Sequence, residues 1–447
     1  MACSRPTKTP LQWHTTFAGS SPVWPSEPAI SAIVSIASAA LSAQHTQVGD
    51  VPSITVNFFA QGTFNKNYEI VIPNQGHKFL FRVTLPVDPF FKTESEVATL
   101  AFLRQKTSIP VPEVVAWSST SDNALGYEWI LLKKVEGVPL EQKWRAISLE
   151  TKIQISERLA AYAAELRSLP FDRIGSLYFE GTNTSAETNS SAQDSQQIKF
   201  MSSYLGKGVE VGQMVLPFFF FKRRLYIPSN RGPFANSLQY LSAKVQMQTA
   251  WIKSGVEIAK AENASDIDSD CDEDLLEEAP EMLEVCQAAQ ELIVRFFPPT
   301  DPDTCHTLYH HDLNQNNIIL DPISHDIVAV IDWEMICVLP QWASFYYPKM
   351  FLDVDPVTEE EPPIPVDYND ENDYTIIRRD RWDARILRRT FDTYIQTVSR
   401  DTNNINFSDG FEERRTLEDV IEDLTDNWEG ARATLRDLQA RAGTVSS

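Results

Sequence analysis

Basic residues are scarce in this chain of 447 residues, which has 39 lysines and arginines against 62 aspartates and glutamates and a formal net charge of −23. Affinity for phosphate backbones comes from clustered lysine and arginine side chains, so the composition argues against a nucleic-acid-binding protein. The same charge argues against docking on an anionic membrane surface. We therefore expect neither nucleic acid nor a membrane surface among the partners.

Cysteine pairs and long apolar runs are also lacking. The five cysteines are irregularly spaced and include no Cys-x-x-Cys pair. That spacing fits neither a disulfide framework nor a zinc site and suits a reducing compartment. No stretch approaches the ~18 apolar residues of a membrane-spanning helix. The apolar segment at residues 30–41 is shorter and indicates a packed helix, so we expect no membrane insertion.

Acidic residues are missing from the stretch before Glu27, which is rich in serine and threonine. This composition resembles that of a mitochondrial presequence, but the stretch has only two basic residues and contains four prolines. We expect a cytoplasmic location, with a mitochondrial location as the alternative.

What is present is ordinary for a globular protein, with 43% hydrophobic and 23% charged residues. At about 150 residues per domain, the length predicts two or three domains or one large two-lobed unit. The pattern along the chain favours an α+β, bilobal architecture. It has a lead-in with a short helix over residues 1–50, a β-rich N-lobe over residues 51–137 and a mainly helical C-lobe over residues 138–447.

The N-lobe pattern is strand-like and interrupted by one helix. In the run at residues 79–85, Phe79, Phe81 and Val83 fall on one side and Leu80 and Arg82 on the other, as in a strand of a sheet. By the same reasoning, strands are predicted at residues 53–59, 68–72, 79–85 and 127–135, and a helix at residues 93–104.

The C-lobe pattern is helical and contains polar insertions. Helices are predicted around residues 155–169, 378–397 and 417–442, and a hairpin of short strands at residues 317–331. Three polar, low-complexity stretches lie near residues 181–197, 262–284 and 353–373. The second is strongly acidic and the third is acidic and contains prolines, and we predict exposed loops for all three.

The strongest signal for chemistry is His310-x-Asp312, then Asn317, then Asp332 at the end of a hydrophobic strand. Phosphoryl transfer needs a carboxylate to orient the attacking hydroxyl and oxygen ligands to hold Mg²⁺ across the phosphates. The predicted hairpin brings Asp332 beside the loop that carries Asp312 and Asn317. The bland alternative is a polar turn followed by a strand-capping aspartate, which is the better account of His310 taken alone.

These residues, followed by Trp333 and Glu334, resemble the motifs of the aminoglycoside phosphotransferase family, a branch of the protein-kinase-like fold. The resemblance spans roughly residues 53–347 and is closest to a fungal phosphotransferase-like branch, which includes proteins named for altered inheritance of mitochondria. It implies Asp312 as catalytic base, Asn317 and Asp332 as magnesium ligands, and structural support from His310. Trp333 and Glu334 are also given a supporting role.

The resemblance also implies nucleotide-binding positions in the N-lobe. Gly62 and Thr63 lie in the turn where a hairpin would cover the phosphates, although a single glycine in a β-turn is an ordinary feature. Glu96 is expected to pair with Arg82 on the third strand, with Glu94 as a nearby competitor. Arg82 stands where the family carries lysine; it keeps the charge but differs in length and geometry, which puts fast catalysis in doubt.

The leading hypothesis is an ATP- and Mg²⁺-dependent phosphotransferase that moves the γ-phosphate to a hydroxyl of a small molecule. The negative charge favours a cationic acceptor through electrostatic steering. The alternative is a catalytically slow or inactive kinase-like, nucleotide-binding interaction module, favoured by Arg82 and the long insertions. The sequence does not specify an acceptor or an oligomeric state.

Overall fold

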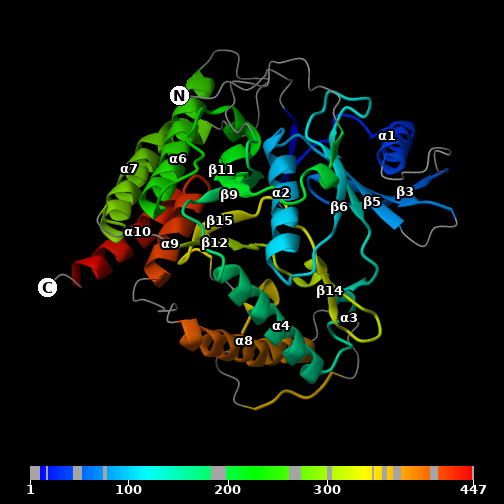
Figure 1. Ribbon diagram of the computed structural model, residues 1–447. Helices are drawn as coiled ribbons and strands as arrows, with labels where there is room; N and C mark the ends of the chain where they lie inside the picture. The colour runs from blue at the N-terminus through cyan, green and yellow to red at the C-terminus, as the bar shows by residue number, and fades with distance from the viewer. Residues whose placement is uncertain are drawn as a thin grey trace.

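The strand-like residues of the N-terminal part form a six-stranded antiparallel sheet in the computed structural model (Figure 1). Its strands, in spatial order, are β10 (Lys199–Phe200), β6 (Val114–Ser118), β7 (Glu128–Lys133), β5 (Lys78–Thr84), β4 (Asn65–Val71) and β3 (Thr55–Gln61). The structure describes residues 11–16, 19–43, 53–73, 78–182, 198–260, 273–299, 305–344, 347–354, 360–365, 374–402 and 411–444.

Two helices cover opposite faces of this sheet, α1 (Ile30–Ser42) and α2 (Phe91–Lys106). Successive residues of a strand face opposite sides, and β7 shows the consequence. Leu131 shares a hydrophobic core with α1, whereas Ile130 shares another core with α2. The predicted alternation in β5 is confirmed, and so are the predicted helices at α1 and α2.

A small hairpin precedes α1 and was not predicted. Its strands are β1 (Trp13–Thr16) and β2 (Gly19–Pro22), which pair with each other in an antiparallel ladder. The lead-in is joined to the N-lobe by side chains, because Lys66 of β4 pairs with Glu27 at 2.5 Å and lies over the Trp24 ring.

The C-lobe is mainly helical, as predicted, and its helices form two groups (Figure 1). In one group α4 (Leu149–Arg167) packs against α8 (Tyr374–Thr402). The other group consists of α6 (Ser237–Lys260), α7 (Glu273–Phe296), α9 (Phe411–Asp423) and α10 (Trp428–Thr444). Short helical segments link them: α3 (Leu140–Lys143), α5 (Pro217–Phe220), η1 (Met201–Ser203), η2 (Lys222–Tyr226), η4 (Gln315–Asn317) and η5 (Lys349–Phe351).

Two small sheets lie in the C-lobe and carry the candidate site. One has the strand order β11 (Val209–Gly212), β9 (Gly175–Phe179), β15 (Cys337–Pro340), β12 (His306–Tyr309). The other has the order β14 (Ile327–Val330), β13 (Ile318–Leu320), β8 (Val138–Pro139). The antiparallel pairing of β13 with β14 confirms the predicted hairpin.

Two predictions for the C-lobe were wrong in part. The acidic stretch near residues 262–284 is not a loop throughout, because α7 begins at Glu273. Leu275, Ala279 and Met282 are buried at helical spacing, so one face of α7 packs inward while many of its acidic side chains lie on the outer face. Residues 261–272 of this stretch, 183–197 of the first one, and 355–359 and 366–373 of the third lie outside the described residues.

The predicted helix at residues 417–442 is two helices, α9 and α10. The first ends at Asp423, and a new one begins after Asn427, whose side chain accepts a hydrogen bond from the backbone N–H of Gly430 at 3.1 Å. An asparagine in this position satisfies a free N–H of the first turn and favours the start of a new helix. The hydrophobic periodicity continues across the break, which is why it predicted one element.

Candidate active site

The structure brings Asp312, Asn317 and Asp332 to one edge of the β13–β14 hairpin. Asp312 follows β12, and Asn317 ends η4 immediately before β13. The backbone N–H of Ile331 donates to the carbonyl oxygen of Asn317 at 2.9 Å, which extends the hairpin ladder by one bond. Asp332 is therefore held directly beside the loop that carries the other two residues, as the sequence predicted.

Asp312 is surrounded by hydrogen-bond donors. Asn317 Nδ2 donates to Asp312 Oδ2 at 3.1 Å, and Asn314 Nδ2 donates to Oδ1 at 3.1 Å. Lys349 Nζ lies 2.5 Å from the same Oδ1. Partial burial raises the pKa of Asp312, but the hydrogen bond and charge of Lys349 outweigh it and lower the pKa below its ordinary value. The carboxyl group is thus ionised at neutral pH.

His310 lies under the loop and holds it to the hairpin. Its Nε2 lies 3.0 Å from the carbonyl oxygen of Ile331, and its ring packs edge-on against Trp333 with centroids 4.7 Å apart. Burial lowers the pKa of His310 to about 4, so the ring is neutral at physiological pH. Because a carbonyl oxygen only accepts, Nε2 carries the proton. These contacts agree with the supporting role predicted for His310.

Asp332 is a carboxylate whose charge is only partly compensated by its neighbours. Its backbone is left-handed, with φ of 67°, a conformation that costs energy for a residue with a side chain. Burial, together with the negative charge of Glu334, raises the pKa of Asp332 to about 7. The positive charges of Arg82 and Lys92 lower this pKa but do not outweigh burial and Glu334. A divalent cation would supply the missing positive charge.

A metal ion here could not be held by the chain alone. Within the described residues, no three or more histidine, cysteine, aspartate or glutamate side chains form a group that could hold a metal ion. Asp332 and the Asn317 amide would offer two oxygen ligands to such an ion. Magnesium is commonly bound by one or two carboxylates and completes its shell with phosphates and water, so this donor set fits a magnesium–nucleotide complex.

Arg82 and Glu96 form the predicted ion pair, from β5 to α2. Glu96 is buried, and its Oε2 has no hydrogen-bond partner in the described structure; the same holds for Arg82 Nε. The competitor Glu94 points elsewhere and accepts hydrogen bonds from Trp117 Nε1 at 3.0 Å and from Lys199 Nζ at 2.7 Å. The two glutamates of α2 therefore have different partners, and the predicted pairing of Arg82 with Glu96 rather than Glu94 is confirmed.

Gly62 and Thr63 lie in the turn between β3 and β4. The Gly62 N–H donates to the carbonyl oxygen of Asn65 at 2.9 Å, which closes the turn. A Cβ atom on Gly62 would meet nothing within 4 Å, so the space beside this glycine is open. Packing therefore does not explain the glycine, and the structure shows no contact that joins Gly62 or Thr63 to Asp312 among the described residues.

Sequence reasoning missed a buried network behind the Arg82–Glu96 pair. Lys92 Nζ lies 2.5 Å from Glu334 Oε2, and Asn65 Nδ2 donates to the same oxygen at 2.7 Å. Asn65 Oδ1 accepts in turn from Lys92 at 3.2 Å and from Thr84 at 3.1 Å. Glu334 is thus more than general support, because it ties the loop of Asp332 to α2 and to the β3–β4 hairpin.

The network was only partly visible in the sequence. Lys92 precedes Glu96 by about one helical turn, so the two side chains share a face of α2, and this spacing was an available signal. Burial raises the pKa of Glu334, but the charges of Lys92 and Arg82 outweigh it and keep the pKa low. Nothing in the sequence indicated that Asn65 or Lys349 would reach these carboxylates.

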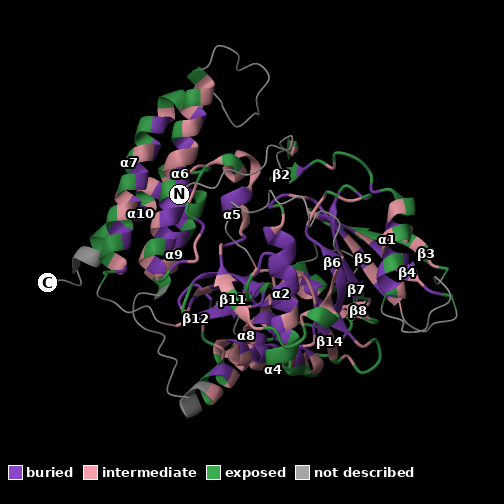
Figure 2. Ribbon diagram, turned by 45° about the horizontal axis from the view of Figure 1, so that its top comes forward, coloured by how far each residue is buried: buried purple, intermediate pink, exposed green. Residues whose placement is uncertain are grey.

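Helix α2 is held between the two lobes, as its nearly continuous burial shows (Figure 2). Lys199, which binds Glu94, lies on β10, a strand that comes from the C-lobe part of the sequence and joins the N-lobe sheet. Arg231 of the C-lobe pairs with buried Asp88 just before α2. These contacts from the C-lobe hold α2, and with it Glu96, in place beside the N-lobe sheet.

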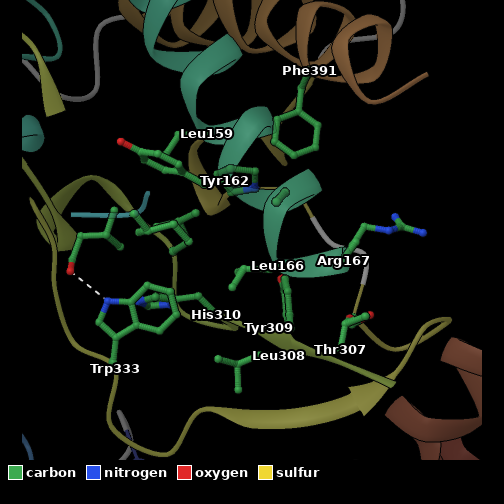
Figure 3. Close-up of a pocket in the computed structure, with 16 residues that line it drawn as sticks. Leu159, Tyr162, Leu166, Arg167, Thr307, Leu308, Tyr309, His310, Trp333 and Phe391 are labelled. Atoms are coloured by element: carbon green, nitrogen blue, oxygen red, sulfur yellow. Dashed lines mark hydrogen bonds between the residues drawn. The ribbon is translucent and has the colours of Figure 1, made fainter. Parts of the chain in front are cut away.

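A cavity of about 60 Å³ lies behind the loop that carries Asp312 (Figure 3). Leu159, Tyr162 and Leu166 of α4 and Phe391 of α8 point into it from one side, and His310 from the other. Its lining is mainly apolar and includes none of the three predicted chemical residues. We therefore assign it no part in phosphoryl transfer.

No helix in the described part of the chain has the length and apolar character needed to cross a membrane.

Comparison with known proteins gives the family. The profile described as the phosphotransferase enzyme family (APH) matches residues 55–343, more than half of the chain. A subtelomeric hrmA-associated cluster protein of Aspergillus fumigatus is 25% identical over 342 residues, which cover 69% of this chain and 63% of that protein. The altered inheritance of mitochondria protein 9, mitochondrial, of Debaryomyces hansenii is 23% identical and covers 67% of this chain and 50% of that protein.

The chain thus spans less than two-thirds of the length of these curated relatives. Among solved structures, an ethanolamine kinase of Plasmodium vivax is 13% identical, with 85% of each chain covered and a TM-score of 0.37. The match of the family profile, which includes the loop of Asp312 and Asn317 and the strand that leads to Asp332, identifies this chain as a member of the phosphotransferase enzyme family (APH).

Proposed function

We propose that this protein is an ATP- and Mg²⁺-dependent phosphotransferase that moves the γ-phosphate of the nucleotide to a hydroxyl group of a small molecule. The observation that carries the proposal is that hydrogen bonds bring Asp312, Asn317 and Asp332 together. The Asn317 amide donates to the Asp312 carboxylate, and the backbone bond from Ile331 to Asn317 holds Asp332 beside them. Family membership supports a phosphotransferase, and this arrangement supports the choice of base and metal ligands.

In this proposal the nucleotide lies between the two lobes. Arg82, held by Glu96, faces the phosphates, and the open turn between β3 and β4, which contains Gly62 and Thr63, covers them. Asp332 and Asn317 would hold Mg²⁺, and the ion would supply positive charge against the phosphates. The buried Lys92–Glu334 pair fixes the position of the Asp332 loop relative to α2.

Asp312 acts as the catalytic base. It accepts the proton of the acceptor hydroxyl while that oxygen forms a bond to the γ-phosphorus and the bond from phosphorus to the leaving ADP oxygen breaks. A base must lie within about 2.6–3.2 Å of the hydroxyl it deprotonates. The amides of Asn314 and Asn317 orient the carboxylate for this contact, and its lowered pKa keeps it ionised.

The acceptor is proposed to be a small, cationic hydroxyl compound, such as an amino sugar or amino alcohol. The net charge of −23 supports this choice, because an acidic protein attracts cations and raises their local concentration near its surface. For the location in the cell, cytoplasm stays the first prediction. The mitochondrial names of yeast relatives such as the Debaryomyces hansenii protein support the alternative.

The test is thermal unfolding with and without Mg·ATP, followed by turnover. At a hundredfold excess over Kd, a ligand of the folded state adds about 2.7 kcal/mol to the unfolding free energy. We expect Mg·ATP to raise the melting temperature of the wild type and to leave that of Asp332→Asn unchanged. Asp326→Asn, in the exposed turn of the same hairpin, is the matched control and should respond like the wild type.

The outcomes separate the two functional hypotheses. No rise in the wild type at millimolar Mg·ATP would refute nucleotide binding and with it the proposal. The slow or inactive nucleotide-binding interaction module would be favoured by a different result. In that case Mg·ATP raises the melting temperature of the wild type and of Asp312→Asn equally, and no phosphate is transferred to any hydroxylated cation. Transfer that disappears in Asp312→Asn while Mg·ATP still binds would support the phosphotransferase.

A further inference from the structure

Lys349 is distant in sequence from the loop that carries Asp312, but two contacts hold it beside that loop. It follows Asp312 by 37 residues, yet its Nζ lies 2.5 Å from Asp312 Oδ1. Its backbone N–H donates to the carbonyl oxygen of Leu313 at 2.8 Å. The backbone bond fixes the start of the side chain beside the loop, which places the ammonium group next to Asp312.

Asp312 does not depend on Lys349 for its orientation. Asn314 and Asn317 donate to its two carboxylate oxygens, and both amides come from the same loop. Lys349 is a third donor, and its side chain is 54% exposed. Solvent-exposed ion pairs contribute little to stability, so this contact breaks readily when a group with more negative charge approaches.

The other cations near the site are committed to partners. Arg82 is paired with buried Glu96, and Lys92 is paired with buried Glu334. The loop from Asp312 to Ile318 contains no basic residue. Lys349 is therefore the cation placed to meet a phosphoryl group at the moment it passes Asp312.

We propose that Lys349 is a catalytic residue that leaves Asp312 and binds an oxygen of the phosphoryl group in transit. The inference rests on the proposed function. The acceptor hydroxyl proton goes to Asp312, the acceptor oxygen bonds to the γ-phosphorus, and the bond to the ADP oxygen breaks. Lys349 stays protonated throughout and contributes a hydrogen bond and a charge, which stabilise the spread negative charge of the transition state.

The experiment compares binding of Mg·ADP with binding of Mg·ADP plus aluminium fluoride, which mimics the phosphoryl group in transit. We expect aluminium fluoride to tighten binding by the wild type. In Lys349→Met the increase in affinity caused by aluminium fluoride should be at least tenfold smaller than in the wild type, while the affinity for Mg·ADP alone is unchanged. Lys349→Arg should recover part of the increase. Lys133→Met is the matched control, because Lys133 is 52% exposed and pairs with Glu113 at 2.8 Å, a carboxylate outside the candidate site.

Each outcome has one meaning. Failure of the wild type to bind Mg·ADP would refute the proposed function itself. A wild type that binds Mg·ADP but gains nothing from aluminium fluoride, or a Lys349→Met variant that gains as much as the wild type, would overturn the role of Lys349 alone. Loss of phosphoryl transfer by Lys349→Met with an unchanged fluoride gain would also overturn it, because the lysine would then act only through Asp312.

Discussion

Replacing Lys92 by methionine tests how far the cleft depends on its hidden ion pair. Methionine keeps the length and apolar stem of lysine and removes the ammonium group. Lys92 is 1% exposed, and its loss leaves the buried carboxylate of Glu334 without its cation. Removing one partner of a buried pair costs about 3–5 kcal/mol. Because Asn65 still donates to Glu334, we expect about 3 kcal/mol, the lower end of that range.

A double-mutant cycle separates the ion pair from the packing of the site. Glu334→Gln removes the opposite charge, keeps the shape and leaves buried Lys92 without its anion, so we expect a cost of about 3 kcal/mol here too. In Lys92→Met/Glu334→Gln no charge is left unpaired. We therefore expect the double variant to cost about 2 kcal/mol less than the two single variants together.

The assay is urea unfolding at pH 7 of the wild type, the two single variants and the double variant, monitored by intrinsic fluorescence. Lys133→Met is again the control, since its exposed pair should change stability by less than about 1 kcal/mol. A cost below about 1 kcal/mol for Lys92→Met, or strict additivity in the cycle, would show that the pair does not hold α2 to the Asp332 loop.

Two further predictions concern pH, and both are measured by urea midpoints across the pH range. In the folded protein the pKa of His310 is about 4, below the ordinary 6.5, so between these pH values His310 is protonated in the unfolded chain but neutral in the folded one. Stability should therefore fall between pH 6.5 and 4, by about 3 kcal/mol in total, and His310→Gln should flatten this part of the profile. For Glu128, burial raises the pKa from 4.5 to about 7, so its contribution is fully present below pH 4.5 and is lost as the pH rises to 7. Glu128→Gln should remove that decline, and a profile that keeps its slope in either variant would assign the titration to other groups.

Much of the local structure followed from the sequence, because local structure depends on neighbours in the chain. The alternation in β5, the helical spacing in α2 and the short β13–β14 hairpin were predicted with nearly their observed bounds. The break between α9 and α10 was missed, since the apolar periodicity continues through it while the Asn427 cap is a single-residue signal. The Glu273 start of α7 was missed because acidic composition hid the buried spacing.

The order and spacing of Asp312, Asn317 and Asp332 were enough to indicate the kind of site, because a short hairpin determines how they meet. Only the tertiary structure decided which charges face them. Lys92 and Glu334, or Lys349 and Asp312, are far apart in sequence, and their pairing depends on how α2 and η5 pack against the loops. Hydrophobic and backbone patterns repeat along a chain and can be predicted from it. A single ion pair across the fold leaves no such pattern, because the packing of distant elements sets its partners and the degree of burial sets its strength.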